Sequence, residues 1–356
     1  MDKRLGRHAA ANVERFVCAG LLAMAAFTMC SVRPLSAASA DYHLLKKVIL
    51  GGEGFWDYLI CDSAARRVYI SRGTHVMVVD ADNYGVVGDI PGTEGVHGIA
   101  LAPEFGRGFT SDGRTNSVTI FDLKTLRVVG TAPTGEGPDA IVYDPASKRV
   151  FTFNGRAGTA TAIDAASGKA VGTVTLGGRP EFAAADGQGH IYNNLEDKSE
   201  IVQIDSQKLT VTATWPLAPG ESPSGLAIDP DHRRLFAGCH NQMMAIVDAD
   251  SGKVLATPKI GQGVDANRFD PGTQLAFSSN GEGTLTIIHE DSPEKFTPTA
   301  SVSTQRGART MALDLKTHNV FLVTAEFGPP PAPTAEHPHP RPQALPGSFT
   351  LLVYGQ

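Results

Sequence analysis

Ionisable side chains recur at a nearly constant interval along this chain, and their types suit the binding of a cation. Seven equivalent positions, separated by steps of 40, 42, 42, 43, 41 and 44 residues, carry Asp57, His97, Asp139, Glu181, Ser224, Asp265 and Arg309. With 19% charged residues and 11 His in the chain, chance would place about one or two ionisable groups among seven positions, whereas six are present. Crowded carboxylates favour a neutralising partner, and carboxylate oxygens are ligands for hard cations.

We therefore expect these seven residues to form a ligand-binding ring. A divalent metal such as calcium or zinc, or a cationic ligand, would be held by Asp57, His97, Asp139, Glu181 and Asp265. Two alternatives stay open. In the first, the ring has no ligand, because a water-filled channel tolerates polar groups and Asp is favourable at the start of a strand, where it accepts a backbone hydrogen bond. Arg309 can also neutralise part of the acidic ring, in which case no cation is needed. Trp56, beside the ring, can stack on a planar or sugar ligand, but packing between neighbouring elements is the interpretation we prefer.

The spacing of these residues follows from a repeated unit of roughly 40–45 residues, which is typical of a four-stranded propeller blade. One repeat predicts strands at Asp139–Tyr143, Arg149–Asn154, Thr159–Asp164 and Lys169–Thr175, separated by turn dipeptides such as Asp-Pro and Asn-Gly. We therefore expect an all-β, seven-bladed β-propeller in one domain. The inner strand of each blade is predicted to be the most uniformly apolar, since neighbouring blades cover both of its faces.

The last repeat supplies only three strands, at Arg309–Leu313, Asn319–Thr324 and Ser348–Tyr354. The segment Leu44–Leu50 resembles the outer strand of other repeats, so we expect it to complete the last blade and remove an open sheet edge. A Pro-rich insertion at 326–347 interrupts this blade and should lie beside one mouth of the channel. Its His337 and His339 can bind a metal, although solvated histidines are the interpretation we prefer.

The first 40 residues have the features of a secretory signal peptide, with basic residues, an apolar run at 16–30 and a small-residue cleavage site after Ala40. We expect a periplasmic or secreted, monomeric propeller at 41–356 without a membrane anchor. This part has 26 Lys and Arg against 35 Asp and Glu, which disfavours electrostatic binding to nucleic acid or anionic lipid. Cys61 and Cys239 are predicted on distant blades and are interpreted as small buried residues without a disulfide.

Three phrases, Val118–Asp122, Arg149–Asn154 and Lys253–Ala256, resemble the YVTN-type repeat, and the chain from Tyr42 onward resembles the YncE-like secreted seven-bladed propellers. This resemblance implies the fold and export. It does not imply one function, because the group includes a DNA-binding periplasmic protein, surface-layer proteins and relatives of dehydrogenase heavy chains.

The ring also resembles the metal site of the gluconolactonase and SMP-30 propellers, since Asp139 and Glu181 follow Pro at inner-strand starts. That resemblance implies a metal-dependent lactonase-like hydrolase, but those enzymes have six blades and a Pro-Asn-Gly motif that this sequence lacks. No Gly-x-Ser-x-Gly or His-Glu-x-x-His motif is found either. We therefore predict an exported, non-catalytic binding or scaffolding propeller with a small-molecule or protein partner at the channel mouth. The lactonase is the first alternative and single-stranded nucleic-acid binding is the weaker one.

Overall fold

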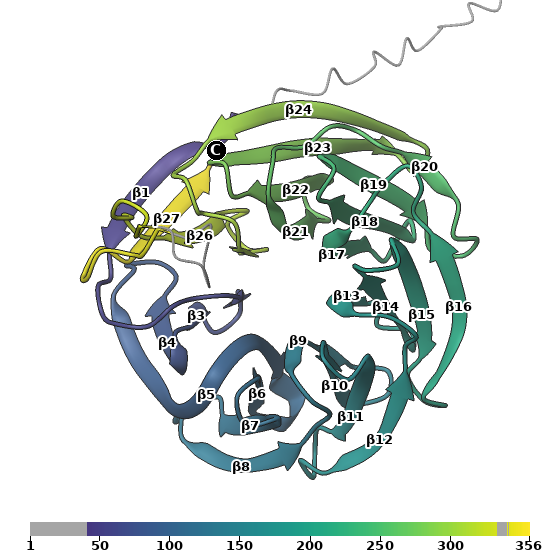
Figure 1. Ribbon diagram of the computed structural model, residues 1–356, viewed down its shortest axis with the longest axis horizontal. Helices are drawn as coiled ribbons and strands as arrows, with labels where there is room; N and C mark the ends of the chain where they lie inside the picture. The colour runs from purple at the N-terminus through teal and green to yellow at the C-terminus, as the bar shows by residue number, and fades with distance from the viewer. Residues whose placement is uncertain (1–40, 333–339, 341) are drawn as a thin grey trace, which may run out of the picture. The chain divides into compact units, whose positions relative to one another are not determined.

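The computed structural model describes residues 41–332, 340 and 342–356, which form a closed ring of antiparallel sheets (Figure 1). The predicted signal peptide at 1–40 and the pair His337 and His339 lie outside the described residues. Five sheets have four strands, and a sixth has seven strands because β5 (Val86–Ala102) belongs to two blades at once. The prediction of an all-β propeller with seven four-stranded blades is confirmed.

Each blade runs from an inner strand at the channel to an outer strand at the rim. The inner strands are β2 (Leu59–Asp62), the second half of β5, β9 (Pro138–Asp144), β13 (Pro180–Ala185), β17 (Pro223–Asp229), β21 (Val264–Asp270) and β25 (Met311–Leu313). The second strands are β3 (Arg67–Ser71), β6 (Arg107–Asp112), β10 (Arg149–Asn154), β14 (His190–Leu195), β18 (Arg234–Cys239), β22 (Leu275–Asn280) and β26 (Val320–Thr324).

The third and outer strands complete the blades. The third strands are β4 (Gly73–Asp80), β7 (Ser117–Asp122), β11 (Thr159–Asp164), β15 (Glu200–Asp205), β19 (Met243–Asp248), β23 (Thr284–Ser292) and β27 (Thr350–Gly355). The outer strands are the first half of β5, β8 (Val128–Pro133), β12 (Ala170–Thr175), β16 (Thr210–Pro216), β20 (Val254–Ala256), β24 (Lys295–Ser303) and β1 (His43–Ile49). One short 3-10 helix, η1 (Pro103–Phe105), lies between β5 and β6, and the described residues contain no helix able to span a membrane.

The core lies between the blades, on the second and third strands. Strands β22, β26 and β27 are buried along their whole length, whereas the inner strands β9 and β13 alternate between buried and partly exposed residues. The prediction that neighbouring blades cover both faces of the inner strands is therefore wrong for β9 and β13. The central channel opens one side of each inner strand, while the second strands are covered by a neighbouring blade on each side.

The N-terminal strand closes the ring, as predicted. Strand β1 pairs antiparallel with β27, from His43 opposite Gly355 to Ile49 opposite Thr350, and β27 continues to β26 and β25. Both edges of β27 are thereby hydrogen-bonded, so the last blade has the same four strands as the others.

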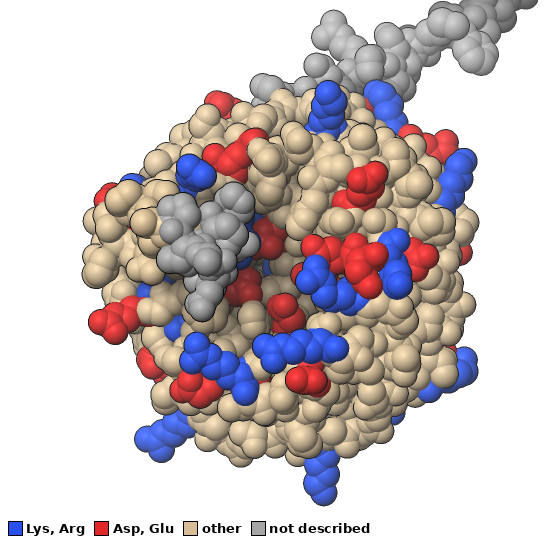
Figure 2. All heavy atoms as spheres, in the orientation of Figure 1, with Lys and Arg blue, Asp and Glu red and all other residues tan. Residues whose placement is uncertain are grey.

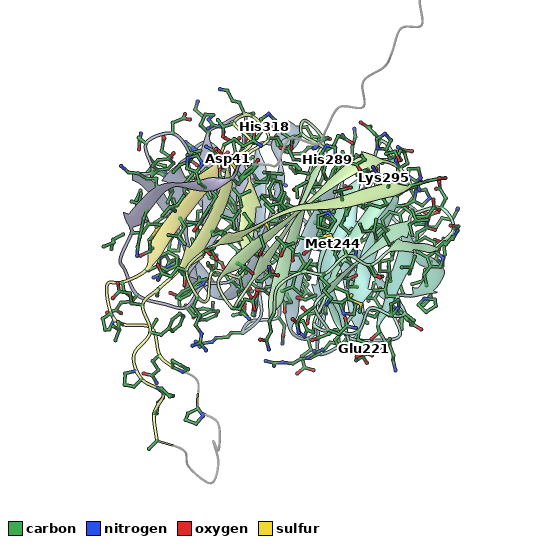
Figure 3. All side chains as sticks on the ribbon, turned by 90° about the horizontal axis from the view of Figure 1, so that it is seen from above. Asp41, Glu221, Met244, His289, Lys295 and His318 are labelled. Carbon is green, nitrogen blue, oxygen red and sulfur yellow. The ribbon has the colours of Figure 1, made fainter. Side chains whose placement is uncertain are left out.

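The Pro-rich insertion leaves the ring between β26 and β27. A short backbone ladder holds its base, where Gly328 N–H donates to Gln343 O at 2.9 Å and Leu345 N–H donates to Glu326 O at 2.7 Å. In Figure 3 the described part of this hairpin extends from the face on which Glu221 lies, opposite the face that carries His289 and His318. Glu221 lies in the loop before β17, so the insertion is on the side where the inner strands begin.

The two cysteines are unpaired among the described residues, as predicted. Cys239 is buried in β18, and burial raises the pKa of its thiol to about 11. Cys61 in β2 is only half-buried, which corrects the expectation that both would be fully buried, although burial still raises the pKa of its thiol to about 12. Neither thiol has the depressed pKa of a reactive cysteine.

Candidate functional site

The seven equivalent residues converge on one mouth of the channel, where they line two adjoining cavities of about 420 and 340 Å³. Asp139 and Glu181 line both cavities. His97 lines the larger one, and the smaller one is lined by the remaining members of the ring: Asp57, Ser224, Asp265 and Arg309. Figure 2 shows acidic atoms inside the central hollow and basic side chains around its rim. The repeat spacing therefore places these side chains where the sequence predicted.

Side chains from the second strands fix the backbone of this ring. Ser71 Oγ accepts a hydrogen bond from Asp57 N–H at 2.9 Å, and Asn193 Nδ2 donates to Glu181 O at 2.7 Å. Three more side chains of the second strands donate hydrogen bonds to backbone carbonyl oxygens of ring residues: Ser111 to Asp139 O, Asn194 to Ser224 O and Ser279 to Arg309 O. Because the second strands are buried, these bonds hold the ring in place before any ligand arrives.

One side of the ring is an acidic pair around His97. His97 Nδ1 lies 2.7 Å from Asp57 Oδ2 and 3.7 Å from Asp139 Oδ1. Burial disfavours the imidazolium, but the hydrogen bond to Asp57 and the charges of both carboxylates outweigh burial and raise the pKa of His97 to about 9. At neutral pH His97 is therefore a cation that partly neutralises this side of the ring.

The other side pairs Asp265 with Arg309, whose Nε lies 3.4 Å from Asp265 Oδ2. Ser224 Oγ donates to Asp265 O at 3.3 Å. Arg309 is half-exposed and lines the smaller cavity beside Asp265, whose charge it partly neutralises. Arg179, next to the ring, forms an ion pair with Glu196.

The carboxyl groups of the ring are held in a state that resists ionisation. Burial, followed by the negative charge of Asp139, raises the pKa of Glu181 from 4.5 to about 8. Burial also raises the pKa of Asp139 and of Asp265, with the charge of Asp57 adding to both. Among the seven ring positions, four carboxyl groups face two cations, His97 and Arg309, and Arg179 next to the ring partly offsets their charge. Complete ionisation of the ring would therefore crowd negative charge at the mouth. A bound cation would remove this cost.

Aromatic rings and one buried arginine lie below the ring. Tyr58 stacks on Phe182 with ring centroids 4.3 Å apart, and the Arg268 guanidinium lies 5.8 Å from the centre of the Phe182 ring. Burial lowers the pKa of Arg268 to about 10, so it stays charged at neutral pH. These residues give the cavity an apolar floor with a fixed positive charge beneath it.

Trp56 lies outside the ring. Its indole packs on Phe349 at 5.2 Å and on Phe327 of the insertion at 6.2 Å between ring centroids. Trp56, Phe327 and Arg309 line a further cavity of about 540 Å³ between the mouth and the base of the insertion. The preferred interpretation of Trp56 as a packing residue agrees with these contacts, although part of the indole remains accessible.

Sequence reasoning missed the residues that support the ring. Arg179 and Arg268 were not singled out, and neither were the polar residues of the second strands: Ser71, Ser111, Asn193, Asn194 and Ser279. The sequence contains a signal for the supporting residues of the second strands, because these polar residues interrupt strands that are otherwise apolar. Arg268 gave a similar signal, since a charged residue inside an inner strand is costly unless it has a specific role.

No known family profile matches this sequence, and no curated protein matches it. Solved structures do match. A chain of Kuenenia stuttgartiensis hydrazine synthase is 15% identical with a TM-score of 0.65, covering 74% of this chain and 91% of its own. The RRP9 WD40 repeats are 9% identical with a TM-score of 0.71, covering 88% and 98%. A chain of a mitotic checkpoint complex is 13% identical with a TM-score of 0.71, covering 96% and 99%. At these identities the likeness shows the propeller fold alone.

Proposed function

We propose that this protein is a non-catalytic binding propeller that holds a small organic cation at the channel mouth. The observation that carries the proposal is that four of the seven ring residues are carboxylic acids, Asp57, Asp139, Glu181 and Asp265, whereas only His97 and Arg309 are ring cations. Further arginines line the outer parts of the cavities, and one of them, Arg179, is paired with Glu196. A ligand with one or two amino or guanidinium groups would neutralise this excess. The cavities have the size of small-molecule sites, which are larger than a bare ion requires.

The raised pKa values define how binding should depend on pH. Glu181 is largely protonated in the free protein at neutral pH, since its pKa is about 8. A cationic ligand prefers the ionised carboxylate, so binding should release a proton and should tighten as pH rises from 6 to 8.5. A neutral ligand held only by shape would not show this dependence.

Thermal shift and calorimetry with ethylenediamine and longer diamines test the proposal. We expect saturating diamine to raise the melting temperature by a few degrees, because ligand at a hundred times Kd adds about 2.7 kcal/mol. The double substitution Asp139→Asn with Glu181→Gln should abolish the shift. Glu294→Gln, at an exposed position in the turn between β23 and β24, serves as the matched control. A shift that survives the double substitution, or no shift with any diamine, would overturn the proposal.

A divalent metal is the second candidate, because donor atoms of Asp57, His97 and Asp139 lie within 4.8 Å of one another. Carboxylates and imidazole suit zinc, and a metal here would support the gluconolactonase resemblance. Zinc must displace the proton of His97, whose pKa of about 9 opposes this at neutral pH. Zinc-induced stabilisation that disappears in His97→Gln, together with hydrolysis of a lactone, would favour the enzyme over the binding protein.

We also infer that the protein works outside the cytoplasm as a monomer. The basic and apolar pattern of residues 1–40 supports export, and the acidic composition of residues 41–356 disfavours nucleic acid as the partner. Recovery of a chain beginning at Asp41 from the periplasm or medium tests the first inference. Salt-sensitive binding to a single-stranded oligonucleotide would contradict the second.

A further inference from the structure

A second cluster of metal-ligating side chains lies at the other end of the blades, between blades five and six. Asp229 ends the inner strand β17, His232 follows in the turn to β18, and Glu290 lies in β23 of the next blade. Asp229 is five positions after Ser224 of the ring, which places the cluster about 17 Å along the strand from the channel mouth. It therefore lies toward the face that carries His289 and His318 in Figure 3.

Three other blade junctions show one way in which this place is filled. A buried aspartate near the end of an inner strand accepts a cation from the turn of the following blade. Arg233 Nη1 lies 3.1 Å from Asp186, and His318 Nδ1 lies 2.7 Å from Asp270. The pair that joins the last blade to the first is the same, with Arg66 Nη1 2.6 Å from Asp314. These three junctions are each closed by a buried ion pair.

The junction between blades five and six lacks that cation, as do the two junctions at which Gly106 and Gly189 hold the turn position. Gln274 occupies the corresponding turn position, with a φ of 56° against 58° for Arg66, 57° for Arg233 and 61° for His318. Its side-chain amide donates to Pro271 O in its own turn at 2.8 Å, away from Asp229. Glu290 adds a second carboxyl group to the site, so this junction has lost a positive charge and gained a potential negative charge.

The remaining contacts leave the two acids under-neutralised. The side chains of Asp229 and Glu290 are both 0% exposed, and His232 Nδ1 lies 2.8 Å from Asp229 Oδ2 and 3.0 Å from Glu290 Oε1. The ring nitrogen is hydrogen-bonded to Glu290 and also approaches Asp229 Oδ2, so one imidazole nitrogen serves two carboxyl groups. Among the described residues, Glu290 Oε2 has no hydrogen-bond partner. Arg234 is nearby but is engaged by Asp248 at 2.8 Å and by Pro293 O. A buried carboxylate oxygen without a partner is costly.

We propose that Asp229, His232 and Glu290 bind a divalent zinc ion that joins blades five and six. Two carboxylates and one imidazole form a mixed oxygen and nitrogen ligand set, which suits zinc better than calcium, since calcium requires six to eight oxygen ligands. Tetrahedral zinc sets its donor atoms roughly 3.3 Å apart. The three donors need only small shifts to reach that spacing. His232 is 38% exposed, so the fourth position is open to a water molecule.

Metal titration of the full propeller, after treatment with a chelator, tests this site. We expect one zinc ion to bind here and to raise the melting temperature, and we expect Glu290→Gln and His232→Gln each to weaken that binding by about 100-fold or more. His289→Gln, beside Glu290, is the matched control and should leave this binding unchanged. Asp139→Asn distinguishes this site from the candidate metal site at the channel mouth. Zinc binding that is lost with Asp139→Asn but retained with Glu290→Gln would overturn the proposal.

A gain-of-charge variant tests the same reasoning without removing a ligand. Gln274→Arg places at this junction the cation that Arg66 and Arg233 supply elsewhere. We expect it to stabilise the metal-free protein and to reduce zinc affinity by tenfold or more, because the guanidinium would occupy the position of the ion. If Gln274→Arg leaves zinc affinity unchanged, the comparison between junctions is wrong.

Discussion

Deleting Phe349–Gln356 should abolish cooperative folding, because the deleted segment contains the strand that joins the two ends of the ring. Strand β27 pairs with both β1 and β26, so its loss leaves two strands with an unpaired edge. Five apolar side chains are lost, each no more than 3% exposed: Phe349, Leu351, Leu352, Val353 and Tyr354. At about 1.5–3 kcal/mol each, their burial contributes about 8–15 kcal/mol as an upper estimate. That equals the whole stability of a typical domain, about 5–15 kcal/mol.

Urea unfolding followed by circular dichroism and tryptophan fluorescence measures this effect. Leu352→Ala provides a graded version and should lower the free energy of unfolding by about 2–5 kcal/mol, because Leu352 is 2% exposed. Lys47→Ala, on the exposed outer strand β1, is the matched control and should change stability by less than about 0.5 kcal/mol. A deletion protein that melts cooperatively within a few degrees of the full chain would refute the closure argument.

Further predictions concern the ring, the thiols and one tight turn. The pKa of Glu181 is raised in the folded state, so the free energy of unfolding of the wild type should fall as pH rises from 4.5 to 8. Above pH 8, Glu181→Gln should be more stable than the wild type by about 1–3 kcal/mol. Equal urea midpoints of the two proteins at pH 9 would contradict this. Cys61 and Cys239, with pKa values raised by burial, should react with a thiol reagent only on unfolding, and rapid labelling of native protein would disprove it. Gly252→Ala should cost about 2–4 kcal/mol, since Gly252 has a φ of 72° and an added Cβ would collide with Trp215; an unchanged urea midpoint would be inconsistent with that turn.

The sequence predicts the fold well because each blade is a local unit. Strands Arg149–Asn154 and Thr159–Asp164 were predicted with the bounds that the structure has, since turn dipeptides mark their ends. The ring positions also follow from the repeat, because equivalent residues on equivalent strands converge on the axis. Asp57 and Asp265 were therefore placed at the mouth without knowledge of any contact.

Contacts between blades could not be predicted in the same way. His232 and Glu290 are 58 residues apart, and their approach depends on how one blade packs on the next. The same holds for the Arg66 and Asp314 pair, which joins the two ends of the chain. Repeat spacing describes positions along each blade, whereas the partner of a side chain depends on the tilt between blades and on its rotamer. The sequence shows that Gln274 stands where Arg66 and Arg233 stand in other blades, but it does not show that Glu290 lies beside Asp229 at that junction.

Strand β5 connects the first two blades without a break. One continuous strand is the outer strand of the first blade, paired with β4, and the inner strand of the second, paired with β6 (Figure 1). Elsewhere, successive blades are connected by separate strands with a loop between them, as between β12 and β13. Gly95 at this joint has a positive φ, as Gly137 and Gly263 have at later joints, but here Gly73 of β4 also pairs with Val96 of β5. This extra pairing ties the first blade to the second, so local opening of the ring should be rarer at this joint than at the loop-connected ones.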